Sequence, residues 1–133
     1  MRILVADDSS EIRDALGLLL REMGRRDIVE ASDVAEALEA CGGPDETAPL
    51  DLVLLDWELP PGTFGPASPA AFVAALREAA PHCYIVAMSA RPEAENESLR
   101  AGCDAFVSRT DPPDRLVALI LGLPDPGLGH AAG

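Results

Sequence analysis

Short runs of apolar residues alternate along the chain with segments in which apolar residues recur every three or four positions. The short runs are typical of buried strands, and the spaced segments are typical of amphipathic helices. Strands are predicted at residues 2–6, 27–30, 50–56, 83–88 and 104–108. Helices are predicted at residues 10–23, 33–41, 69–80, 92–101 and 113–121. This alternation predicts an α/β domain in which helices cover both faces of a five-stranded parallel sheet, as a three-layer doubly wound sandwich.

Polar residues mark the expected starts of several helices. Ser9 or Ser10 can cap the first helix, and Ser68 can cap the third. Asp33 and Glu36 form a capping-box-like start for the second helix. In the last helix, the residues expected to face the core are Leu116, Val117, Ile120 and Leu121.

Two of the predicted strands end in acidic residues. Asp7 and Asp8 follow the run 2–6, and Asp56 ends the run 50–56. Because the carboxyl ends of parallel strands meet at one edge of a sheet, we expect the three carboxylates to converge. A hard divalent cation would relieve their repulsion, and ligand sets made only of oxygen favour Mg²⁺. The sequence therefore predicts a magnesium site in which one of the three acids remains available to take part in a reaction.

Composition limits the class of protein. A chain of 133 residues with 48% apolar and 25% charged residues fits one globular domain and excludes overall disorder. No apolar run is long enough to span a membrane, so we expect a cytoplasmic protein that does not bind membranes. A net charge of −13 argues against direct nucleic-acid binding by this domain. Cys41, Cys83 and Cys103 lack metal-ligand spacing and are expected to be buried free thiols.

Five short motifs together resemble the receiver domain of two-component response regulators. They are Asp7-Asp8, Glu36-Ala37-Leu38, Leu54-Leu55-Asp56-Trp57-Glu58-Leu59-Pro60, Met88-Ser89-Ala90 and Ala101-Gly102-Cys103-Asp104-Ala105-Phe106-Val107. Each motif is weak alone, but their order and spacing are specific. The resemblance implies a flavodoxin-like sheet with strand order 2-1-3-4-5, a receiver domain over residues 1–122 and a flexible tail over 123–133.

The resemblance also implies roles for the acidic residues. Asp56 would be the phospho-acceptor of a bacterial phosphorelay, attacking a phosphoryl group on a sensor histidine kinase, a phosphotransfer protein or a small phosphodonor. Asp8, Asp56 and the backbone carbonyl of Glu58 would bind Mg²⁺ directly, and Asp7 would act through water. Such a protein accepts one phosphoryl group, and any loss of phosphate is its own autodephosphorylation rather than enzymatic turnover.

Two further residues match the family's switch positions. Ser89 corresponds to the hydroxyl that hydrogen-bonds the new phosphoryl oxygen, and Phe106 to the aromatic residue whose rotamer reports phosphorylation. The report would reach the face formed by helix 92–101, strand 104–108 and the last helix, where a downstream protein would bind. Without the surrounding motifs, Ser89 could equally cap a helix and Phe106 could equally fill the core.

The sequence departs from the family at two places. Arg109 stands where the family has a lysine, and Thr110 replaces the usual proline; the chain contains no lysine at all. Arginine offers a longer, planar fork that can pair with two oxygens, so it either changes the signal or reflects compositional drift. The segment 61–68 is longer than is common at this place. It covers the pocket, binds a partner or is a tolerated insertion.

Glu58 and Arg91 flank the route by which water would reach the phosphoryl group. Their opposite charges predict an ion pair that bridges the mouth of the site and hinders that water, the alternative being two independent solvated charges.

Three functions remain open from sequence. The chain is a phospho-accepting switch, a phosphorylation-independent binding module, or a small Mg²⁺-dependent phosphohydrolase with an aspartyl nucleophile. It either stands alone or is the N-terminal receiver of a DNA-binding regulator, and it could form homodimers.

Overall fold

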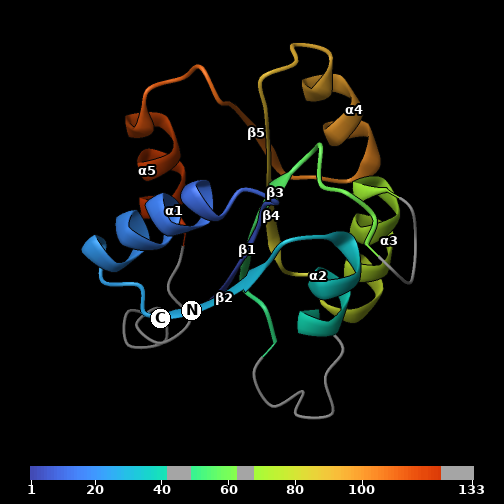
Figure 1. Ribbon diagram of the computed structural model, residues 1–133, viewed down its shortest axis with the longest axis horizontal. Coiled ribbons are helices and arrows are strands. Elements are labelled where there is room, and N and C mark those ends of the chain that lie inside the picture. The colour runs from blue at the N-terminus through green and yellow to red at the C-terminus, as the bar shows by residue number, and fades with distance from the viewer. Residues whose placement is uncertain (42–48, 63–67, 124–133) are drawn as a thin grey trace.

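The computed structural model describes residues 1–41, 49–62 and 68–123, and it contains one five-stranded parallel sheet (Figure 1). The strands are β1 (Arg2–Ala6), β2 (Asp27–Ala31), β3 (Leu52–Asp56), β4 (Tyr84–Ser89) and β5 (Ala105–Ser108). The helices are α1 (Ser10–Glu22), α2 (Val34–Cys41), α3 (Pro69–Ala79), α4 (Ala94–Ala101) and α5 (Pro113–Leu121). The strand order is β2-β1-β3-β4-β5, and all neighbouring pairs are parallel. The predicted fold class and strand order are confirmed.

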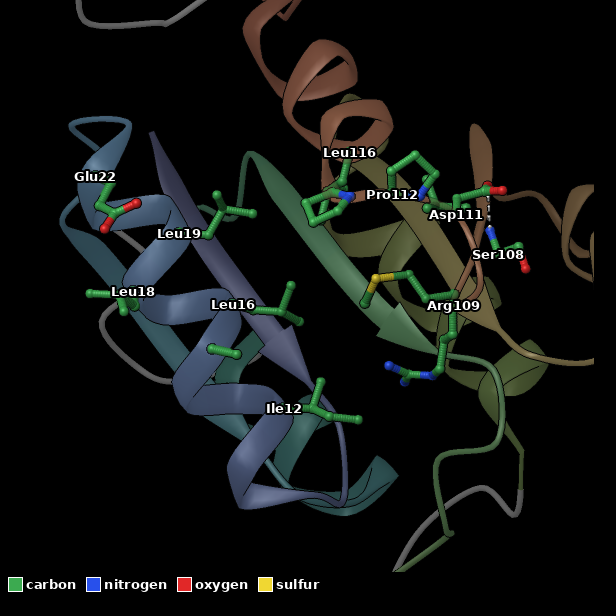
Figure 2. A pocket seen from close by; sticks show the side chains of 14 residues that line it. Ile12, Leu16, Leu18, Leu19, Glu22, Ser108, Arg109, Asp111, Pro112 and Leu116 are labelled. Carbon is green, nitrogen blue, oxygen red and sulfur yellow. Dashed lines mark hydrogen bonds between the residues drawn. The ribbon is translucent and has the colours of Figure 1, made fainter.

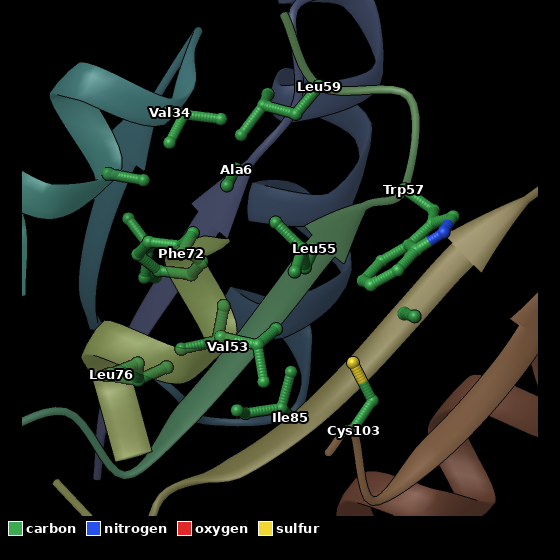
Figure 3. Packing of buried hydrophobic residues seen from close by; sticks show 14 of the residues in the cluster. Ala6, Val34, Val53, Leu55, Trp57, Leu59, Phe72, Leu76, Ile85 and Cys103 are labelled. Carbon is green, nitrogen blue, oxygen red and sulfur yellow. The ribbon is translucent and has the colours of Figure 1, made fainter. Parts of the chain in front are cut away.

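The sheet separates two hydrophobic clusters, because successive side chains of a strand point to opposite faces. In β3, Val53 and Leu55 belong to the cluster that includes residues of α2, α3 and α4. Leu52 and Leu54 belong to the cluster that includes residues of α1 and α5. Figure 1 shows these two groups of helices on opposite sides of the sheet, and Figure 3 shows the first cluster around Phe72. Every residue of β3 is buried, so both clusters hold the end of this strand in place.

Side-chain hydrogen bonds mark the starts of α1, α2 and α3. Ser9, rather than Ser10, caps α1: its hydroxyl accepts from the backbone N–H of Ile12 at 3.3 Å. Ser68 caps α3 in the same way. The Asp33 carboxylate accepts from the backbone N–H of Glu36 at 2.8 Å at the start of α2. These contacts satisfy backbone donors that have no partner within the first turn of a helix.

One predicted core residue is wrong. Leu116 and Ile120 of α5 are buried as expected, and Val117 is half-buried, but Leu121 is 62% exposed. Each residue advances a helix by about 100°, so the residue that follows Ile120 points away from the sheet. Because the last three residues of this helix are all apolar, the sequence alone did not show which of them faces the core.

The strand ends also differ slightly from prediction. β3 begins at Leu52 rather than at residue 50, and β4 continues through Ser89. The extension of β4 matters for the site, because it pairs Ser89 with Ser108 of β5 and fixes the backbone of Ser89 in the sheet. α4 begins at Ala94 rather than at residue 92.

All three cysteines are free thiols, as predicted. Cys83 and Cys103 are buried, but Cys41 is only half-buried. Burial raises the pKa of Cys83 and of Cys103 to about 12, and that of Cys41 to about 11. Thiols with such pKa values remain protonated at neutral pH and are poor nucleophiles.

Most of the predicted loop 61–68 and almost all of the predicted tail 123–133 lie outside the described residues. Within the described part of the chain, no helix combines the length and the apolar character that a membrane crossing requires.

Candidate functional site

Three carboxylates meet at the carboxyl edge of the sheet, as the sequence predicted. Asp7 and Asp8 follow β1, and Asp56 is the last residue of β3. One oxygen from each of the three carboxylates lies within 4.8 Å of the others. β1 and β3 are direct neighbours in the sheet, which brings residues 49 positions apart in sequence into one cluster. An all-oxygen set of this kind fits Mg²⁺ rather than a softer metal.

The two aspartates after β1 differ in their surroundings. Asp7 is 1% exposed; one of its oxygens accepts from the backbone N–H of Ser9 at 2.9 Å, and the other accepts from Arg109. Asp8 is exposed, and its carboxylate has no hydrogen bond or ion pair with any described residue. The oxygens of Asp8 are therefore available to a ligand from solvent, whereas both oxygens of Asp7 are already used.

Asp56 is 4% exposed and is held through one oxygen. Its Oδ1 accepts from the backbone N–H of Glu58 at 2.9 Å and lies 3.4 Å from Nη2 of Arg109. No described residue donates a hydrogen bond to Oδ2. Burial raises the pKa of Asp56 above its usual value, the charge of Asp7 adds to this, and the Glu58 hydrogen bond and Arg109 oppose it.

Arg109 provides positive charge inside the site. Its backbone N–H donates to the carbonyl of Ser89 at 3.0 Å, which continues the pairing of β5 with β4 by one residue. The same guanidinium nitrogen, Nη2, contacts both Asp7 and Asp56. Burial alone would lower the pKa of Arg109, but its hydrogen bond to Asp7 and the charges of both aspartates raise it. Arg109 therefore bridges two carboxylates through one nitrogen. From sequence we expected instead that two of its nitrogens would bind one carboxylate or phosphate group.

The predicted ion pair between Glu58 and Arg91 is confirmed. Arg91 Nε donates to Glu58 Oε1 at 2.9 Å. The same Glu58 oxygen also accepts from the Ser89 hydroxyl at 2.5 Å. Burial opposes ionisation of Glu58, but the hydrogen bonds from Arg91 and Ser89 outweigh it, so the pKa of Glu58 lies below its usual value. Whether this pair hinders water remains a prediction.

The polar contacts continue from Arg91 to α4. Arg91 Nη2 donates to Glu97 Oε1 at 3.0 Å, and the indole N–H of Trp57 donates to the same oxygen at 3.2 Å. Sequence reasoning missed Glu97 and the use of Trp57 as a donor, because nothing in the sequence indicates which helical acid faces the loop after β4. The only available signal was the position of Glu97 near the start of a helix that follows Ser89.

Phe106, the predicted reporter residue, is 6% exposed and belongs to the same cluster as Trp57. Its ring therefore lies inside the protein rather than on the surface of α4, β5 and α5. The exposed apolar residue of α4 on the described surface is Leu99, which is 42% exposed.

A largely apolar cavity of about 550 Å³ lies next to the site, between α1 and the segment from β5 to α5. Figure 2 shows Ile12 and Leu16 of α1 on one side and Leu116 of α5 on the other. Figure 2 shows Arg109 among the residues that line this cavity. Its guanidinium contacts Asp7 and Asp56. Arg109 therefore belongs to both the cavity and the acidic site: it lines the cavity, and its guanidinium contacts Asp56.

The raised pKa of Asp56 predicts that removing its charge stabilises the metal-free protein. In Mg²⁺-free buffer, Asp56→Asn is expected to raise the free energy of unfolding and Tm at neutral pH, because burial disfavours the ionised carboxylate in the folded protein. The folded protein binds the Asp56 proton more tightly than the unfolded chain, so wild-type stability falls as pH rises from about 3.9 through the higher folded-state pKa. The advantage of the variant should grow over that window and then level off.

Urea unfolding of both proteins across this pH range measures that difference. An advantage that is the same at all pH values would mean that the ionisation of Asp56 carries no cost in the folded protein.

Comparison with known proteins defines the class. The response regulator receiver domain family matches residues 3–121. This chain therefore belongs to the response regulator receiver domain family.

Individual relatives agree with that assignment. The phosphate regulon transcriptional regulatory protein PhoB of Klebsiella pneumoniae is 33% identical over 123 residues, which cover 90% of this chain and 49% of PhoB. The chain thus spans about half the length of the curated relatives it matches. PhoB of Escherichia coli strain K12 is 32% identical over the same length.

Solved structures show the same fold. The receiver domain of NtrX from Brucella abortus has a TM-score of 0.74 and 26% identity, covering 90% of this chain and 94% of that one. A CheY-like receiver domain protein from Methanospirillum hungatei JF-1 has a TM-score of 0.74 and 23% identity, covering 90% of both chains. The second likeness supports the fold alone.

Proposed function

We propose that this receiver domain is a phospho-accepting switch in which Asp56 receives a phosphoryl group with the help of Mg²⁺. The observation that carries the proposal is the convergence of Asp7, Asp8 and Asp56 with one cationic side chain, Arg109, at the edge of the sheet. The match to the receiver family over residues 3–121 supports the same conclusion. A binding module that never accepts phosphate would not need an acidic cluster in which one Asp56 oxygen, Oδ2, accepts no hydrogen bond from any described residue.

Asp56 is the nucleophile of the proposed transfer. Its Oδ1 is held by the backbone N–H of Glu58 and by Arg109, which leaves Oδ2 to attack phosphorus. A bond forms between Oδ2 and phosphorus while the bond from phosphorus to the leaving group breaks, and the electron pair of that bond departs with the leaving group. The leaving group is the imidazole of a kinase or phosphotransfer histidine, or acetate when acetyl phosphate is the donor.

Three residues would hold the metal directly, and one would act through water. Asp8, Asp56 and the backbone carbonyl of Glu58 would be the direct ligands; Asp8 is exposed and has no partner among the described residues, so its oxygens are available. Asp7 is the indirect one, since Ser9 and Arg109 already occupy its oxygens. Bound Mg²⁺ would neutralise negative charge on the oxygens of the transferring phosphoryl group.

The readout of the switch involves Ser89 and Phe106. The Ser89 hydroxyl would donate to a phosphoryl oxygen, and the resulting shift of the loop after β4 would change the packing of Phe106. The face of α4, β5 and α5 is then the surface that a downstream protein or a second copy of the domain recognises. A sensor histidine kinase or a phosphotransfer protein is the proposed donor.

The proposed domain acts in the cytoplasm and without direct contact to DNA or membranes. The net charge of −13 supports this, since it repels phosphate backbones. PhoB is named a transcriptional regulatory protein, and this chain covers about half of it. Regulation of transcription through a DNA-binding segment joined to this domain is therefore a second proposal, carried by that likeness alone.

Intact-mass measurement tests the proposed function. The protein is incubated with acetyl phosphate and Mg²⁺, and a matched sample contains EDTA in excess over Mg²⁺. We expect a mass increase of one phosphoryl group with Mg²⁺ and none with EDTA. No increase in either sample would leave the binding module as the better function. Continuous release of phosphate without a labelled intermediate would favour the phosphohydrolase.

A further inference from the structure

The Ser89 hydroxyl is already engaged in this structure. Its O–H donates to Glu58 Oε1 at 2.5 Å, and its oxygen accepts from the backbone N–H of Arg91 at 3.0 Å. A serine hydroxyl carries one proton, so it can donate to one strong acceptor at a time. While Ser89 donates to Glu58, it cannot donate to a phosphoryl oxygen on Asp56.

The contact between Ser89 and Glu58 is a hydrogen bond from a hydroxyl to a carboxylate, which is a strong type of hydrogen bond. Its length lies at the short end of the range for hydroxyl donors to ionised carboxylates, which form stronger hydrogen bonds than neutral acceptors do. Ser89 is 1% exposed, so water competes little for its proton. The hydrogen bond therefore favours the arrangement in which Ser89 points to Glu58.

Glu58 is itself held in position from α4. The oxygen that accepts from Ser89 also accepts from Arg91, whose guanidinium continues to Glu97. The Trp57 indole donates to the same Glu97 oxygen, and Figure 3 shows Trp57 at the end of β3, beside β4. Although Glu58 and Arg91 are partly exposed, the series of contacts fixes the carboxylate next to Ser89.

We propose that Glu58 is a positioning residue that holds the Ser89 hydroxyl away from the phosphoryl site in the resting protein. This inference rests on the proposed function. Phosphorylation of Asp56 then requires an exchange: the hydrogen bond from Ser89 to Glu58 breaks, and one from Ser89 to a phosphoryl oxygen forms. Glu58 keeps its ion pair with Arg91. The exchange slows labelling and links it to the contacts with α4.

Labelling rates in a double-mutant cycle test this role. With acetyl phosphate and Mg²⁺, Glu58→Ala is expected to label about threefold to tenfold faster than the wild-type protein, since Ser89 no longer has to leave a charged acceptor. In a Ser89→Ala background, the same Glu58→Ala substitution is expected to accelerate labelling clearly less, because only the loss of the Glu58 charge then acts on the rate. Glu58→Gln keeps an acceptor oxygen without charge, so its rate should lie between wild type and Glu58→Ala.

The background comparison separates the hydrogen bond from simple electrostatics. Removing the Glu58 charge also reduces repulsion toward an anionic phosphodonor, and that effect would persist without the Ser89 hydroxyl. Glu93→Gln is the matched control: Glu93 pairs with Arg91 at 3.3 Å but does not contact Ser89, and this variant should label like wild type.

The outcomes are distinguishable. Equal acceleration in both backgrounds, or no acceleration by Glu58→Ala when Ser89 is present, would overturn the role of Glu58 while the proposed function stands. Absence of labelling in the wild-type protein and in every variant would overturn the proposed function, and the role of Glu58 with it.

Discussion

Asp56→Asn is expected to take up no phosphoryl group under conditions that label the wild-type protein fully. The reason is chemical: an amide oxygen is far less nucleophilic than a carboxylate oxygen, and the variant otherwise keeps the shape of the site. Asn can still accept the backbone hydrogen bond that Glu58 donates to Oδ1, so the loop after β3 should stay in place. Intact mass after incubation with acetyl phosphate and Mg²⁺ provides the measurement.

The matched control is Asp14→Asn, a substitution of the same kind on the exposed face of α1. That variant should label like wild type. Labelling of Asp56→Asn to the same extent would remove Asp56 from the role of acceptor and direct attention to Asp8, the exposed carboxylate of the cluster.

Asp8→Ala is expected to weaken Mg²⁺ binding by at least about tenfold and to abolish labelling at millimolar Mg²⁺. Asp8 is the carboxylate of the cluster without a partner among the described residues, so its loss removes a ligand that the other two cannot replace. Asp7 is tied to Ser9 and Arg109, and Asp56 is buried.

Titration of Mg²⁺ against tryptophan fluorescence measures this effect, because Trp57 is the single tryptophan and follows Asp56 directly. The wild-type signal should saturate, whereas the signal of Asp8→Ala should not. Asp14→Ala serves as the control for lost surface charge. An unchanged titration in Asp8→Ala would mean that Asp8 is not a ligand and that the metal, if bound, is held elsewhere.

The convergence of the three carboxylates could be predicted from sequence, because it depends only on backbone geometry. A parallel sheet brings the carboxyl ends of its strands to one edge, so an acid at the end of an apolar run has a predictable place. The place of Ser89 came instead from the family resemblance, and the pairing of β3 with β4, which sets Asp56 opposite Met88, puts Ser89 beside the same edge.

The contact of Ser89 with Glu58 could not be predicted in this way. It depends on the side-chain rotamers of Ser89 at the end of β4 and of Glu58 in the loop after β3, and on the position of Arg91, which also donates to the Glu58 carboxylate. Strand and helix periodicity carries no information about such rotamers. The contacts of Arg109 depend on rotamers as well. From sequence we expected its guanidinium to bind both oxygens of one partner, whereas its Nη2 contacts one oxygen of Asp7 and one of Asp56.

The error at Leu121 has a different cause. Periodicity identifies the buried face of a helix well only when polar residues separate the apolar ones, and in the run Leu18-Leu19-Leu20 of α1 Leu18 is likewise 60% exposed. In α5, Leu119, Ile120 and Leu121 are all apolar, and only the middle one is fully buried. The position of each residue around the helix axis, and not its hydrophobicity alone, determines whether it is buried.

The side chains of β3 alternate between the two faces of the sheet, so the register of this strand fixes which residues pack on which face. Leu52 and Leu54 pack toward α1 and α5, while Val53 and Leu55 pack toward α2, α3 and α4. One residue inserted before Asp56 would exchange these two sets and move Asp56 about 3.3 Å along the strand. The fold and the position of Asp56 therefore depend on the same register, so hybrids of this domain with another receiver must be joined within loops and never within a strand.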